Sequence, residues 1–181
     1  MSEDRHGKDH EERKPTVLRT ANGVVAALLC FIFVAHAILG SVKIANPAFS
    51  GRFVWVIWVG VGLVAVHVIM SIGTTVQMWT DKKRPPSDKK KRHQILKWVT
   101  GVALLVTAAI HMAGGMPNAS WPVAILMLLV AATLGWHMFV ASKSLLKDLH
   151  VPDHKRWRVW LRAVLVAACA AAGIIILVAA L

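Results

Sequence analysis

The sequence has few acidic residues, and none of them lies within its apolar runs. Of the 181 residues, 17% are charged and nine are Asp or Glu, whereas soluble domains carry about 25% charged residues. Cys30 and Cys169 both lie inside apolar runs, and the chain has no CxxCH motif. These absences exclude an ordinary soluble domain, a disordered chain and a disulfide-bonded scaffold.

Long apolar runs dominate the chain instead: 56% of the residues are apolar and the mean hydropathy is +0.57. A bilayer core of about 30 Å needs about 20 helical residues. The sequence therefore predicts an all-α integral membrane protein with five transmembrane helices, the first four forming a four-helix bundle. Residues 1–16 are polar and are expected to be a mobile cytoplasmic tail rather than a signal peptide. The expected spans within a membrane domain of residues 17–181 are roughly 19–41, 53–79, 96–114, 120–143 and 158–181.

The positive charge is concentrated on one side of the predicted membrane. The net charge of +12 would by itself suggest nucleic acid. With the N-terminus in the cytoplasm, however, 19 of the 21 basic residues lie inside, and only Lys43 and Arg52 lie outside. The positive-inside rule favours this arrangement. We expect a multi-pass protein of a bacterial or archaeal cytoplasmic membrane, with its C-terminus outside and no nucleic-acid partner.

Each of the first four runs contains one histidine, a residue that is costly at membrane depth and usually functional there. His36 and His111 lie about six residues, or about 9 Å, outward of their span centres. His67 lies slightly inward of its centre, and His137 about five residues inward. The depths predict an outer pair, His36 with His111, and an inner pair, His67 with His137. The other five histidines lie in polar segments and are expected to be solvated; they are His6, His10, His93, His150 and His154.

Two imidazoles that face each other across a helix bundle are the axial ligands of a b-type haem. The pattern predicts two haems b, at levels about 10–17 Å apart along the helices. Two protein ligands per iron leave no open coordination position, which favours electron transfer. The alternatives are histidines that bond a neighbouring helix or line a cavity. A zinc or copper site would place its ligands at one level.

Several other residues are candidates for cofactor contacts. Lys97, Lys143 and Arg19 on the inside, and Lys43 and Arg52 on the outside, are candidate partners of haem propionates, with lipid headgroups as the alternative. Small residues would let a macrocycle or a helix approach, and plain helix packing is the alternative for them. These small residues are Gly23, Gly101, Ser71 and Ala141.

The pattern resembles the membrane cytochrome b subunit of succinate:quinone oxidoreductases and quinol:fumarate reductases, in its single-subunit, five-helix, di-haem type. That type carries one axial histidine in each of the first four spans and none in the fifth, which here would be residues 159–181. The stretch KWVTGVALLVTAAIHM (97–112) is similar to the family's third-span pattern, a Ser/Thr-Gly ten residues before the histidine. Ser71 and Ala141, four residues after His67 and His137, resemble the family's small residues at these places.

The resemblance implies a membrane anchor for a flavoprotein subunit and an iron–sulfur subunit on the cytoplasmic face. Electrons would pass between them and a menaquinone or other quinone, in the respiratory chain and tricarboxylic acid cycle, and the chain itself would hold no soluble catalytic site. Some relatives use transmembrane glutamates for proton transfer, but this chain has none in a span. The candidate quinone-site residues are Asn46, Ser50, Arg52 and Trp55, with interface anchoring as the alternative for the last two.

Two other interpretations remain open at this stage. The chain could be the cytochrome b anchor of a hydrogenase, formate dehydrogenase or nitrate reductase. Such anchors more often place two ligands on one helix. The chain could also be a haem-free helical membrane protein, such as an assembly factor or a small transporter.

Overall fold

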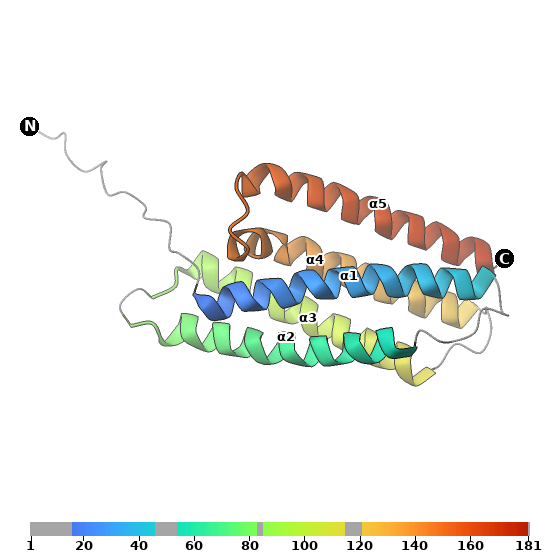
Figure 1. The fold of residues 1–181 in the computed structure, drawn as a ribbon, viewed down its shortest axis with the longest axis horizontal. Coiled ribbons are helices and arrows are strands. Elements are labelled where there is room, and N and C mark those ends of the chain that lie inside the picture. Colours follow the sequence, from blue (N-terminus) through green and yellow to red (C-terminus); the bar gives the residue numbers. More distant parts are fainter. Residues whose placement is uncertain (1–15, 46–53, 83–84, 115–120, 181) are drawn as a thin grey trace, which may run out of the picture.

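The computed structural model describes residues 16–45, 54–82, 85–114 and 121–180. Within these ranges the chain forms five α-helices and no strand, as the sequence predicts. The helices lie along the long axis of the molecule (Figure 1). They are α1 (Val17–Ala45), α2 (Val54–Thr80), α3 (Asp88–Gly114), α4 (Trp121–Asp148) and α5 (His154–Ala180).

Local hydrogen bonds fix several helix ends. The hydroxyl of Thr16 accepts from the backbone N–H of Arg19 at 3.4 Å and so caps α1. At the end of α4, the N–H of Val151 donates to the carbonyl of Leu146 at 3.0 Å, and His150 adopts a left-handed φ of 55°. This is a Schellman motif, and Pro152 follows it. The motif ends α4 and turns the chain toward α5.

The helices extend beyond the predicted spans, most of all α3 and α4. α3 begins at Asp88, eight residues before the expected start of the third span, and α4 continues to Asp148. The residues added to α3 are rich in Lys and Arg, which favour helix, and those added to α4 include Lys147. The basic segments are therefore continuations of the helices rather than irregular connections.

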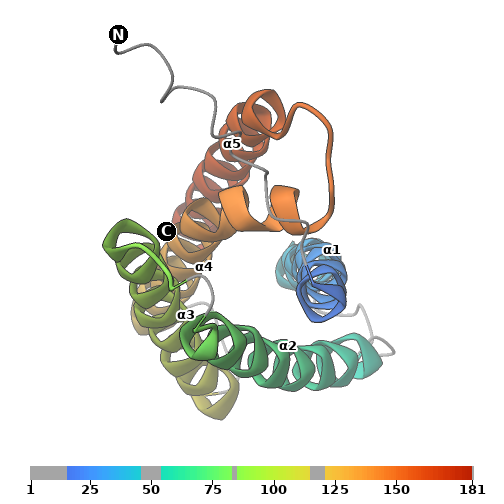
Figure 2. The same ribbon diagram turned by 90° about the vertical axis from the view of Figure 1, so that its left-hand side faces the viewer.

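The first four helices follow one another around a bundle, which Figure 2 shows from its end. Close packing joins α1 with α2, α3 with α4, and α4 with α5, while α1 also touches α4 and α5. The bundle thus consists of two helical hairpins, α1–α2 and α3–α4, with α5 packed mainly against α4.

The outer surfaces of the helices are strongly apolar. Few side chains are buried, whereas Phe31, Trp58 and Ile69 are 72%, 65% and 68% exposed. Exposed apolar surface of this extent is stable in lipid rather than in water. Four helices, α1 to α4, contain segments long and apolar enough to cross a membrane. The chain therefore has the helical character of a multi-pass membrane protein. A membrane crossing by α5 stays a prediction.

Polar and close contacts hold α5 against α4. Arg162 donates from Nε to Ser142 Oγ at 3.1 Å and from Nη2 to the carbonyl of Phe139 at 3.1 Å. Its guanidinium lies 3.9 Å from the centre of the Phe139 ring, a cation–π contact. Further along, a Cβ on Gly135 would lie 2.9 Å from Cys169 Sγ, so α4 and α5 approach closely because Gly135 has no side chain.

Candidate functional site

The outer histidines lie face to edge inside the bundle. His36 comes from α1 and His111 from α3. The centres of their rings are 6.4 Å apart, with an angle of 72° between the ring planes. The structure therefore brings together two side chains that are 75 positions apart in the sequence, as their positions show.

This separation fits two ligands on one metal ion. An imidazole nitrogen binds a metal at about 2 Å, and the ring centre lies about 1 Å further, so two rings on opposite sides of a metal have centres about 6 Å apart. No group of three or more His, Cys, Asp or Glu that could hold a metal occurs within the part of the chain that the structure describes. The arrangement at this point is a pair of imidazoles.

The inner histidines belong to α2 and α4. His137 Nδ1 lies 3.0 Å from the hydroxyl oxygen of Thr100 on α3, and Thr100 is fully buried. The ring lies directly against Gly101, where a Cβ would be 3.2 Å from His137 Cε1. His67 lies within electrostatic range of His137. Its Nδ1 is buried and has no hydrogen-bond partner among the described residues.

The two histidine pairs come from helices that face each other across the bundle. His36 and His111 lie on α1 and α3, and His67 and His137 lie on α2 and α4. In the described ranges, neither of these facing pairs is among the closely packed helix pairs. Facing helices in close contact would leave no room for a macrocycle between them. Because these facing helices are not closely packed, the arrangement is compatible with a macrocycle.

The predicted inside cations differ in how close they lie to the inner histidines. Lys97 interacts electrostatically with both His67 and His137, and its Nζ lies 3.5 Å from Ser144 Oγ. Arg19 on α1 is close enough to interact with Lys97 and Asp148. Lys143 is exposed on α4 and interacts with His93. Lys97 is thus the cation that the structure associates most directly with the inner pair.

The predicted small residues mostly contact protein. A Cβ on Gly23 would lie 3.4 Å from Asp148 and Leu149 at the end of α4. Ser71 Oγ accepts from Asn22 Nδ2 at 3.3 Å and so links α2 to α1. The carbonyl of Ala141 accepts from Ser144 Oγ at 2.9 Å. Gly101 differs from the others, because the ring of a candidate ligand, His137, lies directly against its backbone.

Most of the predicted outer-side residues lie outside the part of the chain that the structure describes. Asn46, Ser50 and Arg52 are outside the described residues, as is the side chain of Lys43. Trp55 is 59% exposed at the start of α2.

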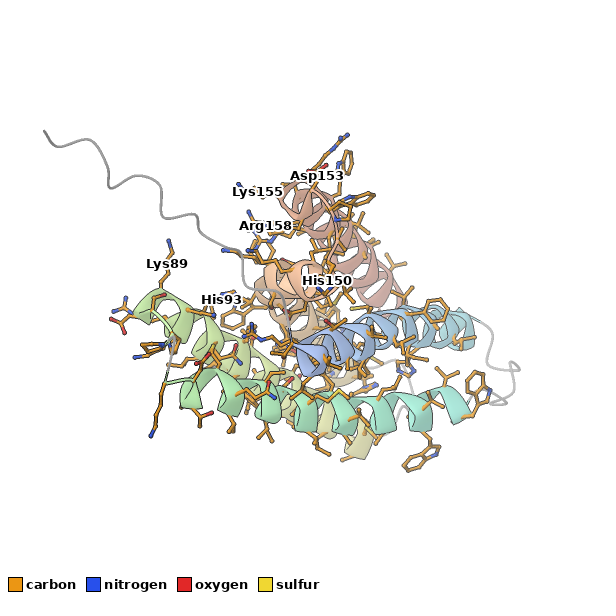
Figure 3. The ribbon with its side chains drawn as sticks, turned by 60° about the vertical axis from the view of Figure 1, so that its left-hand side comes forward. Lys89, His93, His150, Asp153, Lys155 and Arg158 are labelled. Carbon is orange, nitrogen blue, oxygen red and sulfur yellow. The ribbon has the colours of Figure 1, made fainter. Side chains whose placement is uncertain are left out.

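Cationic side chains gather at the end of the molecule where α3 and α5 begin. Figure 3 shows the cations Lys89 on α3 and Lys155 and Arg158 on α5 at this end, together with the imidazole of His93 and the carboxylate of Asp153. His93 differs from the expectation of a solvated side chain, because it is half-buried and its Nε2 has no hydrogen-bond partner among the described residues.

Polar contacts at three places between helices were not expected from the sequence. Thr75 Oγ1 on α2 accepts from Gln94 Nε2 at 2.8 Å and from Trp98 Nε1 at 3.1 Å, joining α2 to α3. The hydroxyls of Thr107 and Thr133 are 2.9 Å apart between α3 and α4. The third contact is that of Thr100 with His137. The Thr100-Gly101 pair was the sequence signal for it, but the pattern assigned no role to the hydroxyl.

Comparisons with protein-family models, with curated proteins and with solved structures gave no match.

Proposed function

We propose that this chain is a membrane cytochrome b that binds two haems b. The observation that carries the proposal is the 6.4 Å separation of the His36 and His111 rings, which suits two imidazoles on one iron. His36 and His111 would hold the outer haem, and His67 and His137 the inner haem. Each iron, held by two histidines, would exchange one electron between its ferric and ferrous states.

The other described contacts support this assignment at the inner site. His137 is held by Thr100, as ligating histidines usually are by a hydrogen bond to their second nitrogen. His67 presents a buried nitrogen without a partner in the described ranges, which a metal bond or a rotated ring would satisfy. Lys97 would neutralise a propionate, with Arg19 and Lys143 as more distant candidates.

The distribution of the histidines supports a narrower proposal. One histidine in the apolar part of each of α1 to α4, and none in the apolar part of α5, is the arrangement of succinate:quinone oxidoreductase and quinol:fumarate reductase anchors. The chain would pass electrons between an iron–sulfur subunit, itself bound to a flavoprotein, and a membrane quinone. The basic end of the bundle would lie in the cytoplasm and α5 would be the fifth span. Anionic partners or lipids would bind at that end.

A reduced-minus-oxidised spectrum of the purified chain tests the cytochrome assignment. We expect an α band and two haems per chain, extractable because they are not covalently attached. A spectrum without an α band would contradict every cytochrome interpretation and leave a haem-free membrane protein.

Purification of the intact complex from its natural membrane tests the narrower proposal. We expect a flavoprotein and an iron–sulfur protein to accompany the chain, together with succinate or fumarate activity. A molybdenum or nickel–iron partner without such a flavoprotein would instead identify the anchor of another oxidoreductase.

A further inference from the structure

Thr100 has one hydroxyl proton and three neighbours that compete for it. Its oxygen lies 3.0 Å from the carbonyl of Leu96 and 3.1 Å from the carbonyl of Lys97, and 3.0 Å from His137 Nδ1. The residue is fully buried. Water therefore cannot take part, and the three neighbours account for the hydrogen bonds of this hydroxyl.

The tautomer of His137 sets the direction of its bond to Thr100. Both carbonyls lie within hydrogen-bond distance of the hydroxyl, and a threonine hydroxyl in a helix usually donates to such a carbonyl, so this geometry favours a proton directed to Leu96 or Lys97. The hydroxyl oxygen then accepts the remaining bond, and His137 Nδ1–H donates it. A neutral imidazole with its proton on Nδ1 carries a free lone pair on Nε2. That lone pair is what a metal ion binds.

Gly101 fixes the ring on the same surface of α3. A Cβ at this position would lie 3.2 Å from His137 Cε1 and 3.5 Å from His137 Nδ1. The ring therefore lies directly against the helix, with Nδ1 at the hydroxyl of the preceding residue. Of the four histidines within the apolar runs, His137 alone has a side-chain hydrogen bond within the described part of the chain.

We propose that Thr100 is a positioning residue for the inner haem, because it fixes the Nδ1–H tautomer and the orientation of His137. This inference rests on the proposed function. A hydrogen bond from the second nitrogen makes an imidazole a more basic ligand. A more basic ligand stabilises ferric over ferrous iron, so Thr100 would lower the reduction potential of the inner haem and leave that of the outer haem unchanged.

The tautomer can be tested on the haem-free full chain in detergent micelles, where no cytochrome is required. Long-range ¹H–¹⁵N spectra of the chain labelled with ¹⁵N at histidine report which nitrogen of each ring is protonated, and His137→Gln identifies the signal. We expect His137 to be protonated at Nδ1 near neutral pH. A proton on Nε2, or on both nitrogens, would overturn the proposal.

The effect on haem is tested with three variants of the holoprotein. Thr100→Val removes the hydroxyl at similar volume, and Thr100→Ser retains it. Thr107→Val is the matched control, because it removes a hydroxyl of α3 that bonds Thr133 rather than a histidine. Redox titration and low-spin haem EPR separate the two haems. In Thr100→Val we expect the ferrous-to-ferric ratio of the inner haem to rise about tenfold at a fixed applied potential. For a one-electron couple this corresponds to a rise of about 59 mV in the midpoint potential of that haem.

The variants have distinct expected outcomes. Thr100→Ser should behave as the parent chain, and Thr107→Val should leave both potentials unchanged. Equal shifts in Thr100→Val and Thr107→Val, or no shift in Thr100→Val, would overturn the positioning role while the two haems themselves remain. If Thr100→Val does not accumulate, Thr100→Ala replaces it in the comparison with Thr100→Ser. Absence of haem from the parent chain would contradict the proposed function instead.

Discussion

The two histidine pairs are built differently. The outer pair is defined by its own rings, 6.4 Å apart, with no hydrogen bond to either ring in the described part of the chain. The inner pair has a surrounding structure: Thr100 bonds His137, Gly101 gives its ring space, and Lys97 lies near both rings. Where no other side chain contacts the ligands of a site, only a change of a ligand alters it. Where other side chains contact the ligands, changes in those side chains also alter the orientation and basicity of the ligands.

The largest expected effect comes from removing a proposed haem ligand of the outer pair. His111→Ala should reduce the haem content from two to one per chain, and the remaining haem should be the inner one, because the two pairs share no histidine. Pyridine haemochrome analysis and redox titration measure the content and the identity. His150→Ala, which changes an exposed histidine in the turn after α4, is the control. Retention of both haems in His111→Ala would contradict the proposed pairing of His36 with His111.

A smaller effect is expected from filling the space beside the inner pair. In Gly101→Ala the new Cβ would meet His137 Cε1 at 3.2 Å, so the ring must shift by a few tenths of an ångström or the helices must separate. We expect up to about tenfold weaker binding of the inner haem, measured as its loss on dilution in detergent. The outer haem should be unaffected. Gly62→Ala, where a Cβ would meet nothing within 4 Å, is the control. Equal loss of both haems would show that the two sites are not separate.

The smallest effect on haem is expected from the contact of α4 with α5, which holds no candidate ligand. Gly135→Ala would place a Cβ 2.9 Å from Cys169 Sγ. Overpacking of this kind destabilises by about 1–3 kcal/mol. Thermal unfolding in detergent should show the loss, while the haem content stays at two. Adding Cys169→Ala should restore stability, because it removes the sulfur that the new Cβ would meet. A loss of haem in Gly135→Ala would mean that α5 is part of the haem-binding bundle.

The sequence predicted the helices well and their ends less well. Hydropathy reports where apolar side chains stop, so it placed the third span at 96 and the end of the fourth at 143. The helices themselves start at Asp88 and end at Asp148, because a backbone hydrogen-bond ladder continues through lysine and arginine. The Schellman turn at His150 was not visible in the sequence either, because its usual residue is glycine.

At the site, the sequence pointed to the histidines from their depths and to Gly101 and Lys97 as candidate contacts, but not to the hydroxyl of Thr100. Which side chain of a neighbouring helix meets His137 depends on helix rotation and crossing, which spacing in one sequence does not fix. Thr100 and Arg162 both lie in apolar surroundings, and only the packed structure shows that they bond His137 and Ser142. Gly23 and Ser71, for which the sequence left a macrocycle and helix packing as alternatives, lie against Asp148 and Asn22 of neighbouring helices.

The division of the bundle into two hairpins has a consequence for assembly. In the proposed ligation each hairpin supplies one histidine to each haem, so neither α1–α2 nor α3–α4 could hold a haem by itself. Synthesis delivers α1–α2 first, and both cofactors would have to wait for the second hairpin. Once inserted, each haem would join one hairpin to the other, where the helices themselves touch mainly through α1 and α4. The cofactors would then act as cross-links, and the mature protein would resist separation of its halves better than its haem-free precursor.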